Sequence, residues 1–78
     1  MHNVLREIGE ERERQIEKGY TPISDGNKPI EAFCVDIHNY NAWASQMALM
    51  QSPSKARKRL IQVAALAMAA VERIDREL

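Results

Sequence analysis

The sequence predicts an all-α protein: an N-terminal helix followed by a long antiparallel αα-hairpin, assembled as a helical-bundle oligomer. Apolar residues recur at helical spacing in three segments, and no run of β-branched residues indicates a strand. A stretch with Gly and Pro at 19–29 and the pair Ser52-Pro53 interrupt the pattern between these segments. In the last segment, 63–71 is apolar on every side, which indicates a helix with several neighbours.

Length and composition favour an oligomer. The 78 residues suffice for one domain, 1–78, whose core alone is marginal for stability. Cys34 is the single cysteine, so neither an intrachain disulfide nor a Cys-based zinc site can supplement that core. Oligomerisation is then the expected source of additional stability. Lys+Arg and Asp+Glu both number 11, and this zero net charge argues against a nucleic acid polymer or an anionic membrane as partner. The chain shows no signal-peptide pattern and no apolar run of membrane-spanning length, so we expect a cytoplasmic protein.

The first helix is predicted over 4–18, with Asn3 as its N-cap and Gly19 as the residue that ends it. Charged side chains of both signs dominate it, and its apolar residues are few. Gly9 stands in its interior, where glycine costs about 1 kcal/mol relative to alanine. Either another backbone or a ligand approaches closely at Gly9, or the helix is a mildly weakened surface helix.

The second helix is predicted over 30–50, directly after Pro29. Helical spacing gives it an apolar face, on which we expect Cys34 to lie as an inert core residue. The residues of this face are Ile30, Phe33, Cys34, Ile37, Tyr40, Asn41, Ala44, Met47 and Ala48.

The third helix is predicted over 53–77, with Ser52 as N-cap and Pro53 at the first helical position. Because the connection is so short, the second and third helices should form the hairpin. The stripe expected to pack on the second helix comprises Leu60, Ala64, Ala67, Val71, Ile74 and Leu78. The adjacent stripe, expected to form the subunit interface, comprises Ile61, Ala65 and Met68.

Two sets of charged residues could bind a ligand. Carboxylates recur at helical spacing near both ends of the chain and could hold Mg²⁺, although the interleaved arginines favour an ordinary salt-bridged helix surface. Cations at 55–59 lie at a helix N-terminus, where they oppose the helix dipole and would be relieved by a phosphate or by acidic residues of another subunit. Tyr40 and Trp43 could stack on a base.

Two segments resemble small, phage-associated, MazG-like proteins. The segment 10–22 (EERERQIEKGYTP) resembles their opening, and 60–75 (LIQVAALAMAAVERID) resembles their closing helix. Together the two cover somewhat less than half of the chain. The resemblance implies an all-α relative of the nucleoside triphosphate pyrophosphohydrolases, which hold Mg²⁺ with acidic residues, cleave between the α and β phosphates, and work as dimers or tetramers.

The match to these enzymes is incomplete. The resemblance makes Glu72/Asp75 an ExxD-like element, and it leaves two choices for the ExxE-like element, Glu7/Glu10 or Glu10/Glu13. The middle helix, where the enzymes carry their central acidic pair, offers only Glu31 and Asp36, which are not spaced as ExxE. This depleted carboxylate set favours a protein that binds nucleotides without cleaving them.

The leading hypothesis is a phage-type homo-oligomer that binds a phosphorylated nucleotide between subunits and sequesters a host immune signal, with no cofactor and no catalytic residue. Its ligand-binding residues would be Arg12, Arg14, Tyr40, Trp43, Lys55, Arg57 and Arg59. The first alternative is an Mg²⁺-dependent pyrophosphohydrolase whose metal ligands would be Glu10, Glu13, Glu72 and Asp75. The second alternative is an interaction protein that inhibits a host partner.

Overall fold

The computed structural model describes residues 3–18 and 29–76, which form three helices and, within these ranges, no strand. Helix α1 spans Val4–Glu17, α3 spans Ile30–Leu49 and α4 spans Pro53–Asp75. The all-α prediction is confirmed, and each helix ends within two residues of the expected position. Gly19 and Leu78, which were given roles at helix ends, lie outside the described residues.

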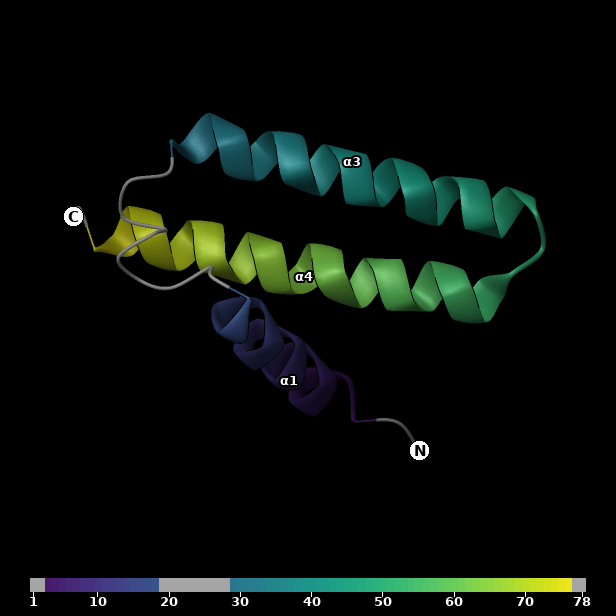
Figure 1. Cartoon of the computed structure of the whole chain (residues 1–78), viewed down its shortest axis with the longest axis horizontal. Helices are drawn as coiled ribbons and strands as arrows, with labels where there is room; N and C mark the ends of the chain where they lie inside the picture. Colours follow the sequence, from purple (N-terminus) through teal and green to yellow (C-terminus); the bar gives the residue numbers. More distant parts are fainter. Residues whose placement is uncertain (1–2, 19–28, 77–78) are drawn as a thin grey trace.

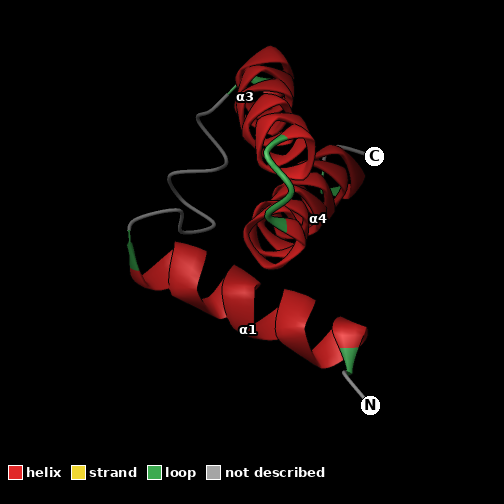
Figure 2. Cartoon of the chain, turned by 90° about the vertical axis from the view of Figure 1, so that its right-hand side faces the viewer, coloured by secondary structure: helices red, strands yellow, loops and turns green. Residues whose placement is uncertain are grey.

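Helix α4 is central to the arrangement. Figure 1 shows α3 and α4 side by side and running in opposite directions, while α1 crosses α4 obliquely. In the end-on view of Figure 2, α4 lies between α3 and α1, so it has a neighbour on each of two sides. Among the described helices, none is both long enough and apolar enough to cross a membrane.

Both predicted N-caps lie at helix starts, but only one makes its capping bond. The backbone N–H of Arg6 donates to Oδ1 of Asn3 at 3.0 Å, which caps α1. Pro53 is the first residue of α4, whereas the side chain of Ser52 makes no capping hydrogen bond, contrary to expectation. Ser52 instead uses its backbone N–H to close the end of α3.

The turn between α3 and α4 is a Schellman motif. The N–H of Ser52 donates to the carbonyl of Met47 at 2.9 Å, and the N–H of Gln51 donates to the carbonyl of Ala48 at 3.1 Å. Gln51 has φ 57°, the left-handed conformation that this motif requires at its first residue beyond the cap. This geometry reverses the chain within two residues and places the end of α3 beside the start of α4.

The core within one chain is small. Phe33 is its only fully buried large side chain among the described residues, and it clusters with Ala69 and Ala70. Most other buried apolar residues are alanines, so the helices approach closely but bury little apolar area. The buried apolar set is Phe33, Ala44, Ala56, Ala65, Leu66, Ala69 and Ala70.

The sequence-based division of the faces of α4 is wrong at several positions, although Met68 of the expected interface stripe is exposed. The stripe assigned to α3 is exposed at Leu60 (49 %), Val71 (55 %) and Ile74 (38 %). Ala65, assigned to a subunit interface, is fully buried within the chain. The physical reason is that α1 and α3 pack on two sides of α4, and the residues they bury are rotated away from the most apolar stripe.

The apolar face of α3 is also narrower than predicted. Phe33 and Ala44 are buried as expected, but Cys34, Asn41 and Ala48 are exposed. Cys34 is therefore a surface thiol and not a core residue. Because α4 is the main packing partner of α3 among the described helices, only a narrow arc of the surface of α3 is covered.

Candidate functional site

A pocket of about 450 Å³ opens where the second half of α3 meets the first turns of α4. The turn at Gln51 and Ser52 brings these two segments together. Residues one helical turn apart on each helix then face the same space. The pocket, here called the cationic pocket, is lined by Trp43 and Met47 of α3 and by Lys55, Lys58 and Arg59 of α4.

An aromatic pair and a guanidinium form one wall of this region. The rings of Tyr40 and Trp43 meet edge to face, with centroids 5.2 Å apart. The guanidinium carbon of Arg59 lies 5.1 Å from the ring centroid of Trp43 and 5.8 Å from that of Tyr40, so it interacts with both π systems. Arg59 also donates to Oε1 of Gln62 at 3.1 Å, which further fixes its position.

The cationic pocket is positively charged. Three of its described lining residues are cations and none is a carboxylate. These cations stand in the first two turns of α4, where they oppose the positive end of the helix dipole. A bound anion would relieve this repulsion, and Trp43, which is 46 % exposed, offers a ring surface beside it.

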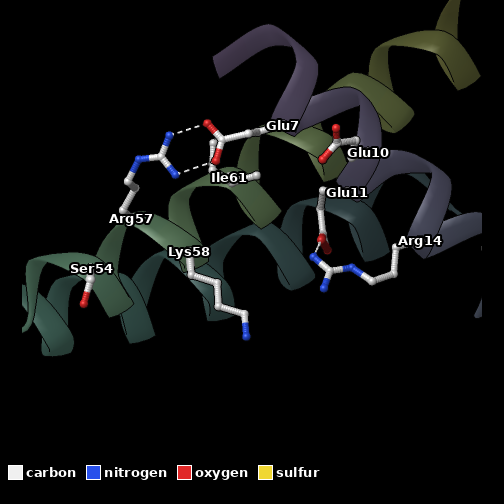
Figure 3. Close-up of a pocket in the computed structure, with 8 residues that line it drawn as sticks. All are labelled: Glu7, Glu10, Glu11, Arg14, Ser54, Arg57, Lys58 and Ile61. Atoms are coloured by element: carbon white, nitrogen blue, oxygen red, sulfur yellow. Dashed lines mark hydrogen bonds and ion pairs between the residues drawn. The ribbon is translucent and has the colours of Figure 1, made fainter. Parts of the chain in front are cut away.

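A second pocket, of about 430 Å³, lies between α1 and α4 and has a different character. Arg57 of α4 forms a two-pronged ion pair with the carboxylate of Glu7 on α1, at 2.8 and 2.5 Å (Figure 3). This hydrogen bond raises the pKa of Arg57 above its ordinary value. The pocket is lined by Glu7, Glu10, Glu11, Arg14, Ser54, Arg57, Lys58 and Ile61.

Acidic residues engage two cations predicted to bind ligand. Arg57 pairs with Glu7, and Arg14 pairs with Glu11, whose side chain is buried against α4 (Figure 3). The Arg57–Glu7 pair links α4 to α1, whereas the Arg14–Glu11 pair lies within α1 and neutralises a buried carboxylate. A phosphate in this pocket would have to compete with carboxylates already in place, which makes the second pocket a weaker anion site than the first.

A third pocket, of about 400 Å³, contains the remaining predicted cation. Arg12 lines it together with Arg76 and the two carboxylates predicted as an ExxD-like element, Glu72 and Asp75. The predicted ligand-binding set is thus divided among three places. Trp43, Lys55 and Arg59 lie together with Tyr40, whereas Arg14 and Arg57 share the second pocket and Arg12 lies in the third.

The four predicted Mg²⁺ ligands do not converge within one chain. Glu10 lines the second pocket, Glu72 and Asp75 line the third, and Glu13 is exposed and lines none of the three. Residues 3–18 and 29–76 contain no group of three or more His, Cys, Asp or Glu side chains placed to hold a metal. Within the described part of one chain, the four predicted ligands therefore do not form a common site of the kind that Mg²⁺ needs.

Sequence reasoning missed the roles that three residues have in these pockets. Lys58 lines both the cationic pocket and the second pocket, although it was omitted from the ligand set. Glu7 and Glu11 hold arginines at the contact of α1 with α4. Their i, i+4 spacing, continued by the buried Gln15, was the signal that could have identified the face of α1 that packs on α4.

Comparisons with models of protein families, with curated proteins and with solved structures find no match to this chain. The fold and the site together define a class of protein: small helical proteins with a cationic, aromatic surface pocket. The functional argument therefore rests on the chemistry of that pocket.

Proposed function

We propose that this protein is a homo-oligomer that binds a phosphorylated nucleotide in the cationic pocket and sequesters it without cleaving it. The observation that carries the proposal is the juxtaposition of Trp43 and Arg59 with two lysines at the start of α4. An aromatic ring accepts a base by stacking, and adjacent cations bind phosphate oxygens. The two requirements of a nucleotide ligand are thus met at one place.

Each group has a definite role in the proposal. The ring of Trp43 stacks on the base, and Tyr40 supports that ring edge to face. Lys55 and Lys58 bind the phosphate as flexible point charges, whereas Arg59, held against the rings, presents fixed N–H donors. Since α3 and α4 of one chain supply all of these residues, each subunit carries its own pocket, and the ligand need not lie between subunits as first expected.

The chemistry of the lining supports binding over cleavage. A pyrophosphohydrolase needs carboxylates beside the phosphates to hold Mg²⁺ and to activate water. The described lining of the cationic pocket supplies cations, an aromatic ring and a thioether in that position. Sequestration of a nucleotide signal, which we infer by analogy in size and class with small oligomeric helical phage proteins, requires only affinity for the ligand.

Calorimetric titration with a panel of linear and cyclic nucleotides tests this function. We expect at least one nucleotide to bind, and Lys58→Ala or Arg59→Ala to weaken it roughly tenfold or more, because each removes a charged hydrogen bond to phosphate. Lys18→Ala, which removes an exposed lysine at the end of α1, is the matched control and should leave affinity unchanged. If no nucleotide binds at high micromolar concentration, the proposal is wrong.

The Mg²⁺-dependent pyrophosphohydrolase is the second candidate. The observation that favours it is the shared pocket of Glu72 and Asp75 with Arg12 and Arg76, which places an acidic pair beside cations that could hold phosphate. Release of pyrophosphate from nucleoside triphosphates with Mg²⁺, lost in Glu72→Ala and retained in Lys58→Ala, would establish this activity in place of sequestration.

A further inference from the structure

The two walls of the cationic pocket differ in charge. Helix α3 contributes Trp43 and Met47, which carry no charge, and α4 contributes Lys55, Lys58 and Arg59. The spacing of these cations, i, i+3 and i+4, places them on one face of α4 within about one helical turn. A ligand in the pocket therefore meets an apolar wall on one side and a cationic wall on the other.

The positive charges of the α4 wall have no acidic counterpart in the described part of the chain. No carboxylate is among the described lining residues, and no ion pair between described residues involves Lys55, Lys58 or Arg59. Arg57, beside them in sequence, differs because it is bonded twice to Glu7. Lys58 also borders the second pocket, but in Figure 3 its ammonium group points away from Glu7. A ligand therefore has to supply the negative charge.

Charge balance points to the phosphate state of that ligand. A phosphate monoester carries about −1.5 to −2 charges at pH 7. The second phosphate of a nucleoside diphosphate adds a further negative charge, which brings the ligand close to the three positive charges of the pocket. The phosphodiester of a cyclic mononucleotide carries a single negative charge and leaves most of the cationic wall unbalanced.

The chemistry of the lining also determines whether Mg²⁺ accompanies the nucleotide. Proteins hold the Mg²⁺ complex of a nucleotide through carboxylates that join the phosphates around the ion. The described lining supplies no carboxylate, and the ion would stand beside ammonium groups of like charge. Coordination of Mg²⁺ also reduces the negative charge that the phosphates present to the lysines. The metal-free nucleotide is therefore the form that suits this pocket.

We propose that the cationic pocket selects a nucleoside diphosphate in its metal-free form. The phosphates lie along Lys55, Lys58 and Arg59, and the base lies on the ring of Trp43, which is 46 % exposed. Mg²⁺ then competes with the protein for the ligand and does not assist its binding. The inference rests on the proposed function and specifies the phosphate state and the metal state of its ligand.

Calorimetric titration compares the cyclic monophosphates, the monophosphates and the diphosphates of adenosine, guanosine, cytidine and uridine. The buffer contains EDTA, and NaCl fixes the ionic strength because salt screens exposed charges. For the base that binds best, we expect the diphosphate to bind roughly tenfold more tightly than the monophosphate, since its added charge meets unpaired cations. A monophosphate or cyclic nucleotide that binds as tightly as the diphosphate of the same base would overturn the inference.

Repeating the titration with excess MgCl₂ and no EDTA, at the same ionic strength, tests the metal-free form. The affinity for the diphosphate should fall roughly tenfold, because the ion neutralises charges that the cations of the pocket would otherwise meet. The affinity for the monophosphate, which coordinates Mg²⁺ much more weakly, should change little. Unchanged or higher affinity for the diphosphate in Mg²⁺ would overturn the inference, and higher affinity is what the pyrophosphohydrolase candidate predicts.

Lys55→Gln tests where the second phosphate lies. Lys55 is suitable because, unlike Lys58, it lines the cationic pocket and neither of the other two described pockets. The substitution should weaken binding of the diphosphate more than binding of the monophosphate. Lys18→Gln removes another exposed lysine, at the end of α1, and should preserve the preference for the diphosphate. Equal losses for the two nucleotides in Lys55→Gln would contradict the proposed position of the phosphates.

The outcomes separate this inference from the proposed function. A nucleotide that binds without preference for the metal-free diphosphate refutes the inference and leaves the proposed function standing. If no nucleotide binds in either buffer, both are wrong.

Discussion

Gly9 occupies the interior of α1, yet a side-chain carbon built at this position would meet nothing within 4 Å. Of the two interpretations left open by the sequence, a close approach by another part of the chain is therefore not what the described residues show. Glycine here weakens the helix because it loses more backbone freedom on folding than alanine does.

We therefore expect Gly9→Ala to stabilise the protein by about 0.5–1 kcal/mol, as alanine does in an open helix interior. Urea unfolding followed by circular dichroism measures the change, and Gly9→Ser should give a smaller gain because serine has a lower helix propensity. A loss of stability in Gly9→Ala, accompanied by a change in mass on light scattering, would contradict this expectation and indicate that another subunit packs at Gly9.

Single residues also show what sequence could and could not predict. Asn3 was predictable as a cap because asparagine is a favoured N-cap residue and because it directly precedes the first residue of the helix. The left-handed conformation of Gln51 was not predictable, since Gly is the residue that usually signals it. Ser52 looked like a cap by its type, but its backbone N–H is used to terminate α3 and its side chain is left out of the cap.

At the scale of helices, existence and bounds were predictable, but orientation was not. Periodicity identifies an apolar stripe and gives no information about which neighbour covers it. Helix α1 packs on α4 through the buried polar residues Glu11 and Gln15, which a search for apolar stripes passes over. As a result the stripe of Leu60 and Val71 was assigned to α3, although it is open to solvent. The cationic pocket was predictable in part, because Trp43 and Arg59 come from segments that the short turn must bring together.

The ion pair between Glu7 and Arg57 should fix α1 against α4. The raised pKa of Arg57 means that its contribution to stability is present at every pH below the ordinary arginine value and is lost only as the pH rises through the higher folded value. Deprotonation of Arg57 therefore does not weaken the ion pair at neutral pH. Substitution of the partner is the practical way to remove it.

We expect Glu7→Gln to increase hydrogen exchange of the α1 amides several-fold while the α3 amides stay protected, because the link between α1 and α4 is lost. Hydrogen exchange followed by mass spectrometry resolves the two helices. Glu10→Gln is the control, since Glu10 pairs at 3.4 Å with Arg6 of the same helix on an exposed surface. Equal effects of the two substitutions would mean that the Glu7–Arg57 pair does not hold α1 in place.

For the whole molecule, the small core and the exposed apolar side chains Leu60, Val71 and Ile74 of α4 predict that stability depends on association. The melting temperature should rise by several degrees over roughly a hundredfold increase in protein concentration, because dissociation accompanies unfolding. Scanning calorimetry measures this directly. Val71→Glu should show no such dependence, and a wild-type melting temperature independent of concentration would argue that one chain is stable alone.

The central claim is that a nucleotide stacks on Trp43 in the cationic pocket. Trp43 is the single tryptophan of the chain, so tryptophan emission, excited selectively over the two tyrosines, reports on this site alone. The decisive measurement is a fluorescence titration with the nucleotide that binds most tightly in calorimetry, with inorganic pyrophosphate as the ligand without a base. The account predicts saturable quenching by the nucleotide, a much smaller change with pyrophosphate, and a shift to higher concentration in Arg59→Ala. Calorimetric binding that leaves Trp43 emission unchanged would contradict the account, because the ligand would then lie elsewhere.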